Sequence, residues 1–232
     1  MRARRALRRH ADELGAPIAV HYSRPGVWTK LICLAFWLLT LSSAAVNPDP
    51  DPMLNLLFPA VMAVLVLGFY ALIRGETLAV CERGLLIGST ALFLRPYVLR
   101  YEEIMPGSIT PVTGTRRIGL SLGIPPKGIF HTIRSGAWIH QGIYLIGPPP
   151  LQPQFSRGKI LRITTNGRAW IWFAGTGRTP PEQVTAQIAA AAHRAGFVQL
   201  ADGAARAVPQ HLNGSVAHSR AVLPGFTYGI RV

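Results

Sequence analysis

The stretch 53–73, MLNLLFPAVMAVLVLGFYALI, has no charged residue over its whole length. As a helix it would be about 31 Å long at 1.5 Å per residue, close to the ~30 Å thickness of a bilayer's hydrocarbon core. Pro59 and Gly68 are both tolerated in such a helix. The sequence therefore predicts a transmembrane span at 53–73.

A second apolar stretch precedes the first. Residues 31–46 are uncharged, and 27–29 extend the stretch past Lys30, whose long side chain can reach the headgroups. The link at 47–52, NPDPDP, carries three prolines that block helix continuation. We therefore expect spans at about 27–46 and 53–73, joined as an antiparallel transmembrane hairpin over 27–73.

The distribution of basic residues predicts the orientation of this hairpin. Residues 1–30 hold seven Lys or Arg residues, whereas the link holds two Asp and no basic residue. By the positive-inside rule both termini are cytoplasmic, in a multi-pass protein of the inner (plasma) membrane. A signal peptide cleaved after 43–45, SAA, is the alternative, but a long basic region precedes it and a second full span follows.

The N-terminal segment 1–26 is a basic cytoplasmic segment in this topology. Its apolar positions, at 3, 7 and 14, fall with His10 on one face of a helix, with arginines on the other face. One interpretation is a helix on anionic lipid, and the other is a topology signal alone. The membrane-surface residues would be Arg2, Arg4, Arg5, Arg8 and Arg9.

The overall composition is basic, with a formal net charge of +14, and only 15% of residues are charged. Such a balance raises nucleic acid as a partner. The basic residues are dispersed, however, and neither a helix-turn-helix nor a zinc pattern occurs, so nucleic acid is an unlikely partner. Cys33 and Cys81 lack a metal-binding spacing and are predicted to be reduced packing residues.

Beyond residue 75 the pattern changes from helical to strand-like. Two β-rich runs at 77–82 and 85–87 flank Arg83-Gly84, which predicts a tight hairpin. A second hairpin is expected where 159–165 and 168–174 flank Asn166-Gly167, a sequence that favours a type I′ turn. Further strands are expected at 97–104, 116–124 and 142–146.

One helix is expected to close this domain. Thr179-Pro180-Pro181-Glu182 has the form of a capping box, with Thr179 as the N-cap. Apolar residues then follow at helical spacing up to Gly196, which can end the helix in a left-handed conformation. The remaining residues, 198–232, are expected to form a poorly ordered tail.

This order of elements resembles the bacterial pleckstrin-homology-like (PH-like) domain found in small membrane proteins with a two-helix hairpin. The resemblance rests on CERGLLI at 81–87, RYEEI at 100–104, LRITT at 161–165 and TPPE at 179–182. It covers about 76–197 and departs from the family over 105–157, which is long and rich in Gly and Pro. It implies a mainly-β domain, a partly open antiparallel barrel with a C-terminal capping helix, and no single function.

No catalytic motif is found. The histidines show no H-E-x-x-H pattern, and neither a G-x-S-x-G elbow nor a phosphate-binding loop occurs. We therefore expect no enzyme activity, no cofactor and no metal. One basic cluster could contact anionic lipid headgroups or an acidic partner, although a solvated loop is the alternative; its members are Arg116, Arg117, Lys127 and Arg134.

The leading functional hypothesis is a non-catalytic, membrane-anchored adaptor or assembly subunit that presents the PH-like domain for protein or lipid binding. Its partners would be the lipid bilayer, other membrane or cytoplasmic proteins, and anionic headgroups. A component of a lipid-processing or transport enzyme system is the alternative, but the only strongly polar residues well inside the spans are Thr40 and Asn55, and neither is ionisable. Nucleic-acid binding at the membrane is the third hypothesis.

Overall fold

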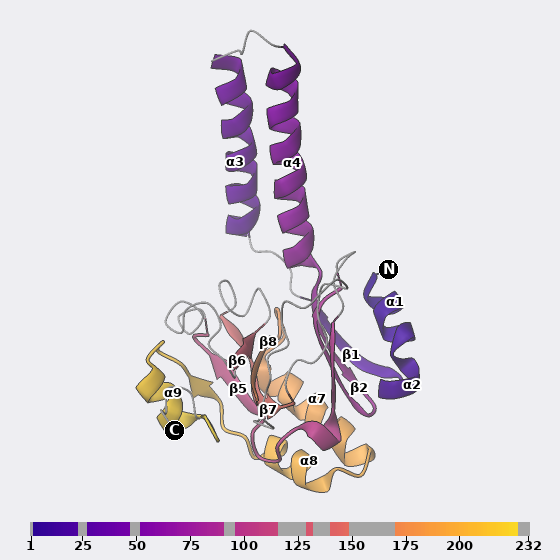
Figure 1. The fold of residues 1–232 in the computed structure, drawn as a ribbon. Coiled ribbons are helices and arrows are strands. Elements are labelled where there is room, and N and C mark those ends of the chain that lie inside the picture. The colour runs from indigo at the N-terminus through magenta and orange to yellow at the C-terminus, as the bar shows by residue number, and fades with distance from the viewer. Residues whose placement is uncertain are drawn as a thin grey trace. The chain divides into compact units, whose positions relative to one another are not determined.

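The structure is a computed structural model, and it describes residues 2–22, 27–46, 52–90, 96–115, 129–131, 140–148 and 170–226. The chain forms two compact units (Figure 1). Unit 1 combines Met1–Ser23 with Gly75–Val232, and unit 2 is Arg24–Arg74. The N-terminal segment therefore folds with the C-terminal part of the chain, although unit 2 separates the two in the sequence.

Unit 2 is a pair of helices, α3 (Val27–Val46) and α4 (Pro52–Arg74), which lie side by side (Figure 1). The Thr40 hydroxyl donates to the Trp37 carbonyl at 2.7 Å, so this polar group is satisfied within its own helix. Many large apolar side chains point outward from both helices, and Trp28, for example, is 77% exposed.

Among the described residues, no helix combines the length and the apolar character needed to cross a membrane. This finding contradicts the predicted transmembrane hairpin with spans at about 27–46 and 53–73. It also contradicts the predicted multi-pass location in the inner membrane with both termini cytoplasmic.

Unit 1 contains a four-stranded antiparallel sheet in the order β1-β2-β3-β4. Its strands are β1 (Pro17–Tyr22), β2 (Glu76–Cys81), β3 (Gly84–Ser89) and β4 (Tyr97–Arg100). The predicted hairpin around Arg83-Gly84 is confirmed, because β2 and β3 pair directly across this turn. The chain after β4 forms a short 3-10 helix, η1 (Tyr101–Glu103), where the sequence predicts a continued strand.

A five-stranded sheet has the order β6-β8-β7-β5-β9. Its strands are β5 (Thr110–Thr113), β6 (Ile129–His131), β7 (Gln141–Gly147), β8 (Trp170–Gly175) and β9 (Gln210–His211). The pairs β5–β9 and β6–β8 are parallel, and the others are antiparallel.

These two sheets contradict the predicted PH-like, partly open antiparallel barrel. The N-terminal segment supplies β1 as an extra edge strand, and β6 and β9 join their sheet in parallel. A β-rich run alone does not specify which distant segment it pairs with, so the order of strands could not be predicted from the pattern. Most of the predicted hairpin around Asn166-Gly167 and the strand at 116–124 lie outside the described residues.

Three helices complete the C-terminal part of unit 1: α7 (Pro181–Arg194), α8 (Val198–Ala205) and α9 (Val216–Val222). The predicted helix is confirmed as α7, and Gly196 has the expected left-handed φ of 86°. Its N-cap is Pro180, without the predicted Thr179 cap. The expectation of a poorly ordered tail is wrong for 198–226, because α8 buries Leu200 in the core.

The main core lies where both sheets meet α7 and α8. Period-two alternation along β2 and β8 puts every second side chain into it, including Val80 and Trp172, together with Ile188 of α7. The other face of β8 contributes Phe173 to a second cluster, against Phe226. Both faces of β8 are therefore covered, as its bulky residues on alternate positions predict.

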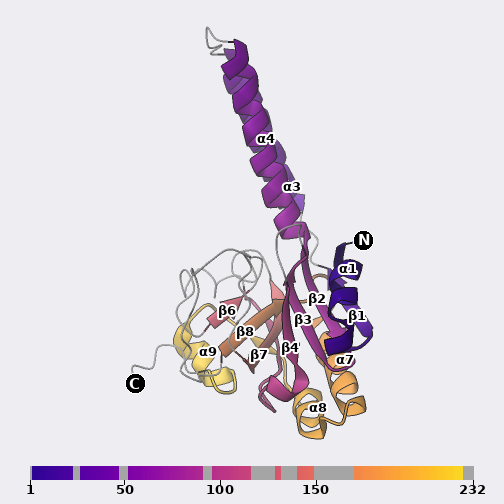
Figure 2. The same ribbon diagram turned by 45° about the vertical axis from the view of Figure 1, so that its right-hand side comes forward.

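The outer face of the four-stranded sheet is covered by two short helices, α1 (Arg2–Arg9) and α2 (Ala11–Leu14) (Figure 2). Leu7 and Leu14 are buried there against Cys81 and Leu86. Cys81 is a free, fully buried thiol, as predicted, and burial raises its pKa to about 11. The predicted amphipathic pattern is confirmed to this extent: leucines face the sheet, and the described arginines are exposed.

Candidate functional site

A groove lies at the end of the four-stranded sheet, around the turn between β2 and β3. It consists of a large pocket of about 560 Å³ and a small pocket of about 320 Å³, which share Arg83 and Ala195. We call these two pockets together the end groove. Asp12, Glu13, Arg100, Glu102 and Phe197 complete the large pocket, and Ile18, Glu82, Ala191 and Arg194 complete the small one.

One wall of the end groove is formed by the N-terminal segment, which is fixed to the β2–β3 turn by backbone hydrogen bonds. The Arg83 amide donates to the Leu14 carbonyl at 2.9 Å, and the Glu82 amide donates to Ala16 at 3.1 Å. In return, the Ala16 amide donates to the Glu82 carboxylate at 3.1 Å. Gly15 allows this approach, because its φ is 74° and a Cβ there would collide with Glu82.

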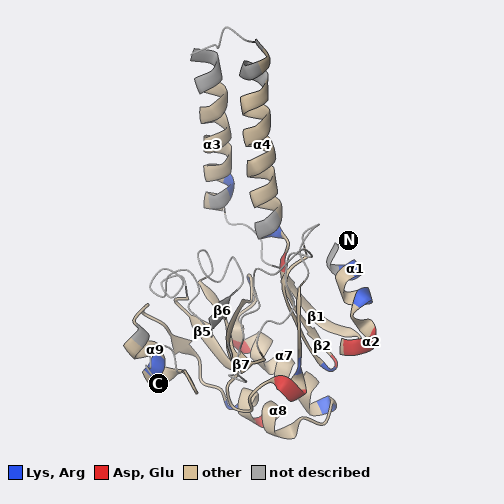
Figure 3. Ribbon diagram, viewed as in Figure 1, with Lys and Arg blue, Asp and Glu red and all other residues tan. Residues whose placement is uncertain are grey.

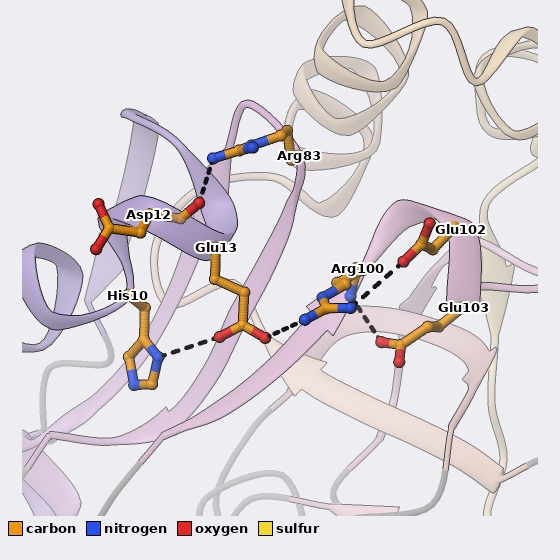
Figure 4. Close-up of polar contacts among 7 residues, drawn as sticks. All are labelled: His10, Asp12, Glu13, Arg83, Arg100, Glu102 and Glu103. Atoms are coloured by element: carbon orange, nitrogen blue, oxygen red, sulfur yellow. Dashed lines mark hydrogen bonds and ion pairs between the residues drawn. The ribbon is translucent and has the colours of Figure 1, made fainter.

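An ionic network crosses the large pocket (Figure 4). Arg100 Nη2 lies 2.7 Å from Glu13 Oε1, and its Nη1 lies 3.5 Å from Glu102 Oε1. The Arg100 amide donates to Glu103 Oε2 at 3.0 Å, and the Glu103 side chain thereby closes the turn of η1. The hydrogen bond and charge of Glu13 raise the pKa of Arg100 above its ordinary value. The network joins α2 to the end of β4 and holds the carboxylates of Glu13 and Glu102 at the edge of the pocket.

Two arginines of the end groove keep hydrogen-bonding capacity for a ligand. Arg83 Nη2 donates to the Asp12 carbonyl at 2.6 Å, and Arg194 Nε donates to the Ala190 carbonyl at 3.2 Å. Each guanidinium has five N–H donors. Within the described part of the chain, their remaining donors have no protein partner. Both side chains are exposed.

The apolar surface of the groove is supported from below by a buried tyrosine. Phe197 packs on Tyr101 edge to face, with ring centroids 6.0 Å apart. The Tyr101 hydroxyl donates to the Cys81 carbonyl at 2.9 Å, and burial raises the pKa of Tyr101 above its ordinary range. The floor of the groove is therefore fixed, whereas the charged side chains at its rim are in contact with water.

A second polar connection fixes the N-terminal segment to α7. His21 of β1 is 8% exposed, and its Nδ1 and Nε2 lie 3.0 Å from Thr179 Oγ1 and 2.8 Å from Gln187 Oε1. Because Gln187 Oε1 accepts, a neutral His21 donates from Nε2 and accepts the Thr179 hydroxyl at Nδ1. Burial lowers the pKa of His21, and the hydrogen bond to Gln187 opposes this effect. Thr179 thus binds His21 and does not cap α7.

The predicted site residues lie elsewhere. The basic cluster Arg116, Arg117, Lys127 and Arg134 falls outside the described residues. In the N-terminal segment, Arg2 belongs to α1, and the side chains of Arg4, Arg5, Arg8 and Arg9 are exposed. Figure 3 colours the described basic residues of α1 and the acidic residues of α2. Of the arginines of α1 whose side chains are described, none lines the end groove.

The end groove was not identified from the sequence, because its walls come from four distant segments. Two of these, around Arg83-Gly84 and Arg100-Tyr101, carried a structural pattern but no binding motif. Among the described residues, no group of three or more His, Cys, Asp or Glu side chains is placed to hold a metal ion. The arrangement is suited to binding a ligand that has charges of both signs and some apolar surface.

No protein-family model, curated protein or solved structure matches this chain. The resemblance to the PH-like membrane protein family is therefore corrected on two grounds: no family match supports it, and the two sheets do not have the arrangement that it implies.

Proposed function

We propose that this chain is a non-catalytic adaptor whose unit 1 binds an extended segment of a partner protein in the end groove. The observation that carries the proposal is the mixed character of the groove. Three carboxylates (Glu13, Glu82 and Glu102) and three guanidiniums surround apolar surface contributed by Ile18, Ala195 and Phe197. Its total volume falls in the usual range for ligand sites.

The charge balance favours a polypeptide over an anionic headgroup. A site for phosphate groups alone would have an excess of arginine or lysine, because each nearby carboxylate repels the ligand. A peptide can present basic, acidic and apolar groups within a few residues. The end groove has complementary groups for all three.

The apolar exterior of unit 2 also supports an adaptor. Large apolar side chains on α3 and α4 are exposed, including Leu39 at 66% and Val64 at 69%. Helices with apolar side chains on all sides are normally covered by other apolar surface. An adaptor makes contact with two partners. In this proposal, the apolar surface of unit 2 makes one of these contacts and the end groove makes the other.

The test is capture of partners by the full chain and by two tryptophan variants of α7 and its C-cap. Ala195→Trp fills the space shared by both pockets, whereas Ala186→Trp adds the same side chain at an exposed position outside the groove. We expect a stoichiometric partner to be recovered with the wild type and with Ala186→Trp, and lost with Ala195→Trp. Equal recovery with both variants, at equal thermal stability, would reject the groove as the binding site.

The exposed arginines of α1 favour a second candidate, contact with an anionic surface. Leu7 is buried against the sheet, whereas the side chains of Arg4, Arg5, Arg8 and Arg9 are exposed. Each basic residue near an anionic lipid surface contributes about 1 kcal/mol. We expect substitution of Arg8 and Arg9 by Glu to weaken binding to vesicles containing phosphatidylserine. An unchanged affinity for these vesicles, relative to purely zwitterionic ones, would remove this candidate.

A further inference from the structure

The two pockets of the end groove differ in charge. The small pocket has Arg83 and Arg194 against Glu82 alone, and Glu82 already accepts a hydrogen bond from the Ala16 amide. In the large pocket, Glu13 and Glu102 both pair with Arg100, and Asp12 contributes the carbonyl that accepts from Arg83, while its carboxylate points away (Figure 4). The small pocket therefore has an excess of positive charge, whereas the charges of the large pocket balance.

The small pocket combines guanidinium donors with apolar surface. Arg194 uses only Nε in a hydrogen bond to the protein, so its two terminal nitrogens are available to a ligand within the described surroundings. A carboxylate accepts two parallel N–H bonds from such a fork. Ile18, Ala191 and Ala195 line the same pocket, next to the arginines. This combination fits a ligand whose carboxylate is bonded to a carbon atom that carries an apolar side chain.

We propose that the end groove recognises a free polypeptide carboxyl terminus, with the terminal carboxylate and an apolar last side chain in the small pocket. The chain then extends past Arg83 and Ala195 into the large pocket, where a basic side chain lies between Glu13 and Glu102. This proposal rests on the proposed function and adds the class and direction of the ligand. The excess of positive charge in the small pocket fixes that direction.

The probes are three short peptides, titrated against the full chain and followed by NMR or calorimetry. The first is acetyl-Ala-Lys-Ala-Leu with a free carboxylate, and the second is its carboxyl-terminal amide. The third, acetyl-Ala-Lys-Glu-Leu amide, has its only carboxylate in a side chain. We expect the first peptide to bind about tenfold or more tightly than the other two, since only it retains the charge-assisted bonds at the terminus.

Arg194→Gln is the informative variant, because the hydrogen bond of Arg194 is to Ala190 of its own helix, and no hydrogen bond or ion pair joins it to the described part of the N-terminal segment. We expect it to weaken binding of the free-acid peptide about tenfold and to leave the amide unchanged. Arg206→Gln is the control, because Arg206, at the C-cap of α8 and outside the groove, makes the same bond from Nε to the carbonyl four residues earlier, in addition to an exposed ion pair with Asp202. We expect it to have no effect on either peptide.

The outcomes separate this inference from the proposed function. Equal binding of acid and amide, or an equal effect of Arg194→Gln on both, overturns recognition of the carboxyl terminus. Tighter binding of the third peptide than of the second would assign the site to side-chain carboxylates and would likewise overturn it. Either result leaves the proposed function intact if Ala195→Trp still abolishes partner capture. Full binding of the free-acid peptide to Ala195→Trp would overturn the inference even if partner capture were lost.

Discussion

The two faces of the four-stranded sheet are covered in different ways. The inner face meets the other sheet and two helices in one large core, which includes Trp172 and Ile188. The outer face is covered by α1 and α2, which bury only Leu7 and Leu14 among their larger apolar residues. The inner face is therefore stabilised by packing in a large core. The cover of the outer face, formed by α1 and α2, depends on two leucines and on the hydrogen bonds and ion pairs of the N-terminal segment. This outer cover also forms one wall of the end groove.

The largest expected effect is on the inner face. Trp172 is 1% exposed, its ring packs edge to face with Tyr97, and its Nε1 donates to the Pro148 carbonyl at 2.8 Å. We expect Trp172→Ala to lower the free energy of unfolding of unit 1 by about 3–5 kcal/mol. Hydrogen exchange of β3 amides measures this change. Trp28→Ala removes an exposed tryptophan from unit 2 and should leave the same amides unaffected.

A smaller and more local effect is expected on the outer face. Leu14 is 1% exposed, and we expect Leu14→Ala to lower the free energy of unfolding by about 2–3 kcal/mol. This value is in the lower part of the range for such substitutions, because the cluster around Leu14 is small. The loss should appear as faster exchange of β1 amides, with β3 much less affected. Equal acceleration in β1 and β3 would mean that the N-terminal segment and the sheet unfold together. Val208→Ala, at an exposed position, is the control.

The hydrogen bonds of His21 to Thr179 and Gln187 make the attachment of β1 dependent on pH. Because burial lowers the pKa of His21, the folded protein binds the proton less readily than the unfolded chain does. Its contribution to stability is therefore complete above the unfolded pKa of about 6.5 and declines as the pH falls from there toward the folded pKa. We expect β1 amides to exchange faster at pH 5.5 than at pH 7.5, after correction for intrinsic rates. His21→Gln, which cannot titrate, should lose this difference, and a difference that persists in the variant would assign it to other groups.

The smallest expected effect concerns Glu13. Its ion pair with Arg100 is in contact with water, and such pairs contribute little because solvent and salt screen them. We expect Glu13→Gln to change β1 exchange less than Leu14→Ala does, and to have no effect at 1 M salt. Glu182→Gln, at an exposed position of α7, is the matched control. A Glu13 effect as large as that of Leu14 would show that the outer cover depends mainly on ionic contacts.

The elements that the sequence could predict are those with local signals. The β2–β3 hairpin follows from alternation around Arg83-Gly84, and α7 follows from helical spacing that ends at Gly196. The strand β1, PIAVHY, was missed because its pairing partner β2 lies more than fifty residues away. The cap at Thr179 was predicted from local spacing, but a distant residue, His21, takes its hydroxyl.

The end groove could not be predicted for the same reason. Its charged residues are brought together by long-range pairing of β1 with β2 and by the return of α7 to the sheet. The two-span prediction failed in a different way, because it relied on composition over 27–73, and the described residues contain no helix that could cross a membrane. Composition indicates how apolar a segment is, but it does not identify the surface that covers it.

The most direct test of the central claim is site-specific photocrosslinking of the full chain in cells that produce it. A photoreactive phenylalanine analogue is placed at position 195, in the end groove, or at position 186, on the exposed side of α7. We predict a single crosslinked partner from position 195, attached through a peptide near its carboxyl terminus, and none from position 186. Equal crosslinking from both positions, or none from position 195, would contradict the claim that the end groove binds a partner.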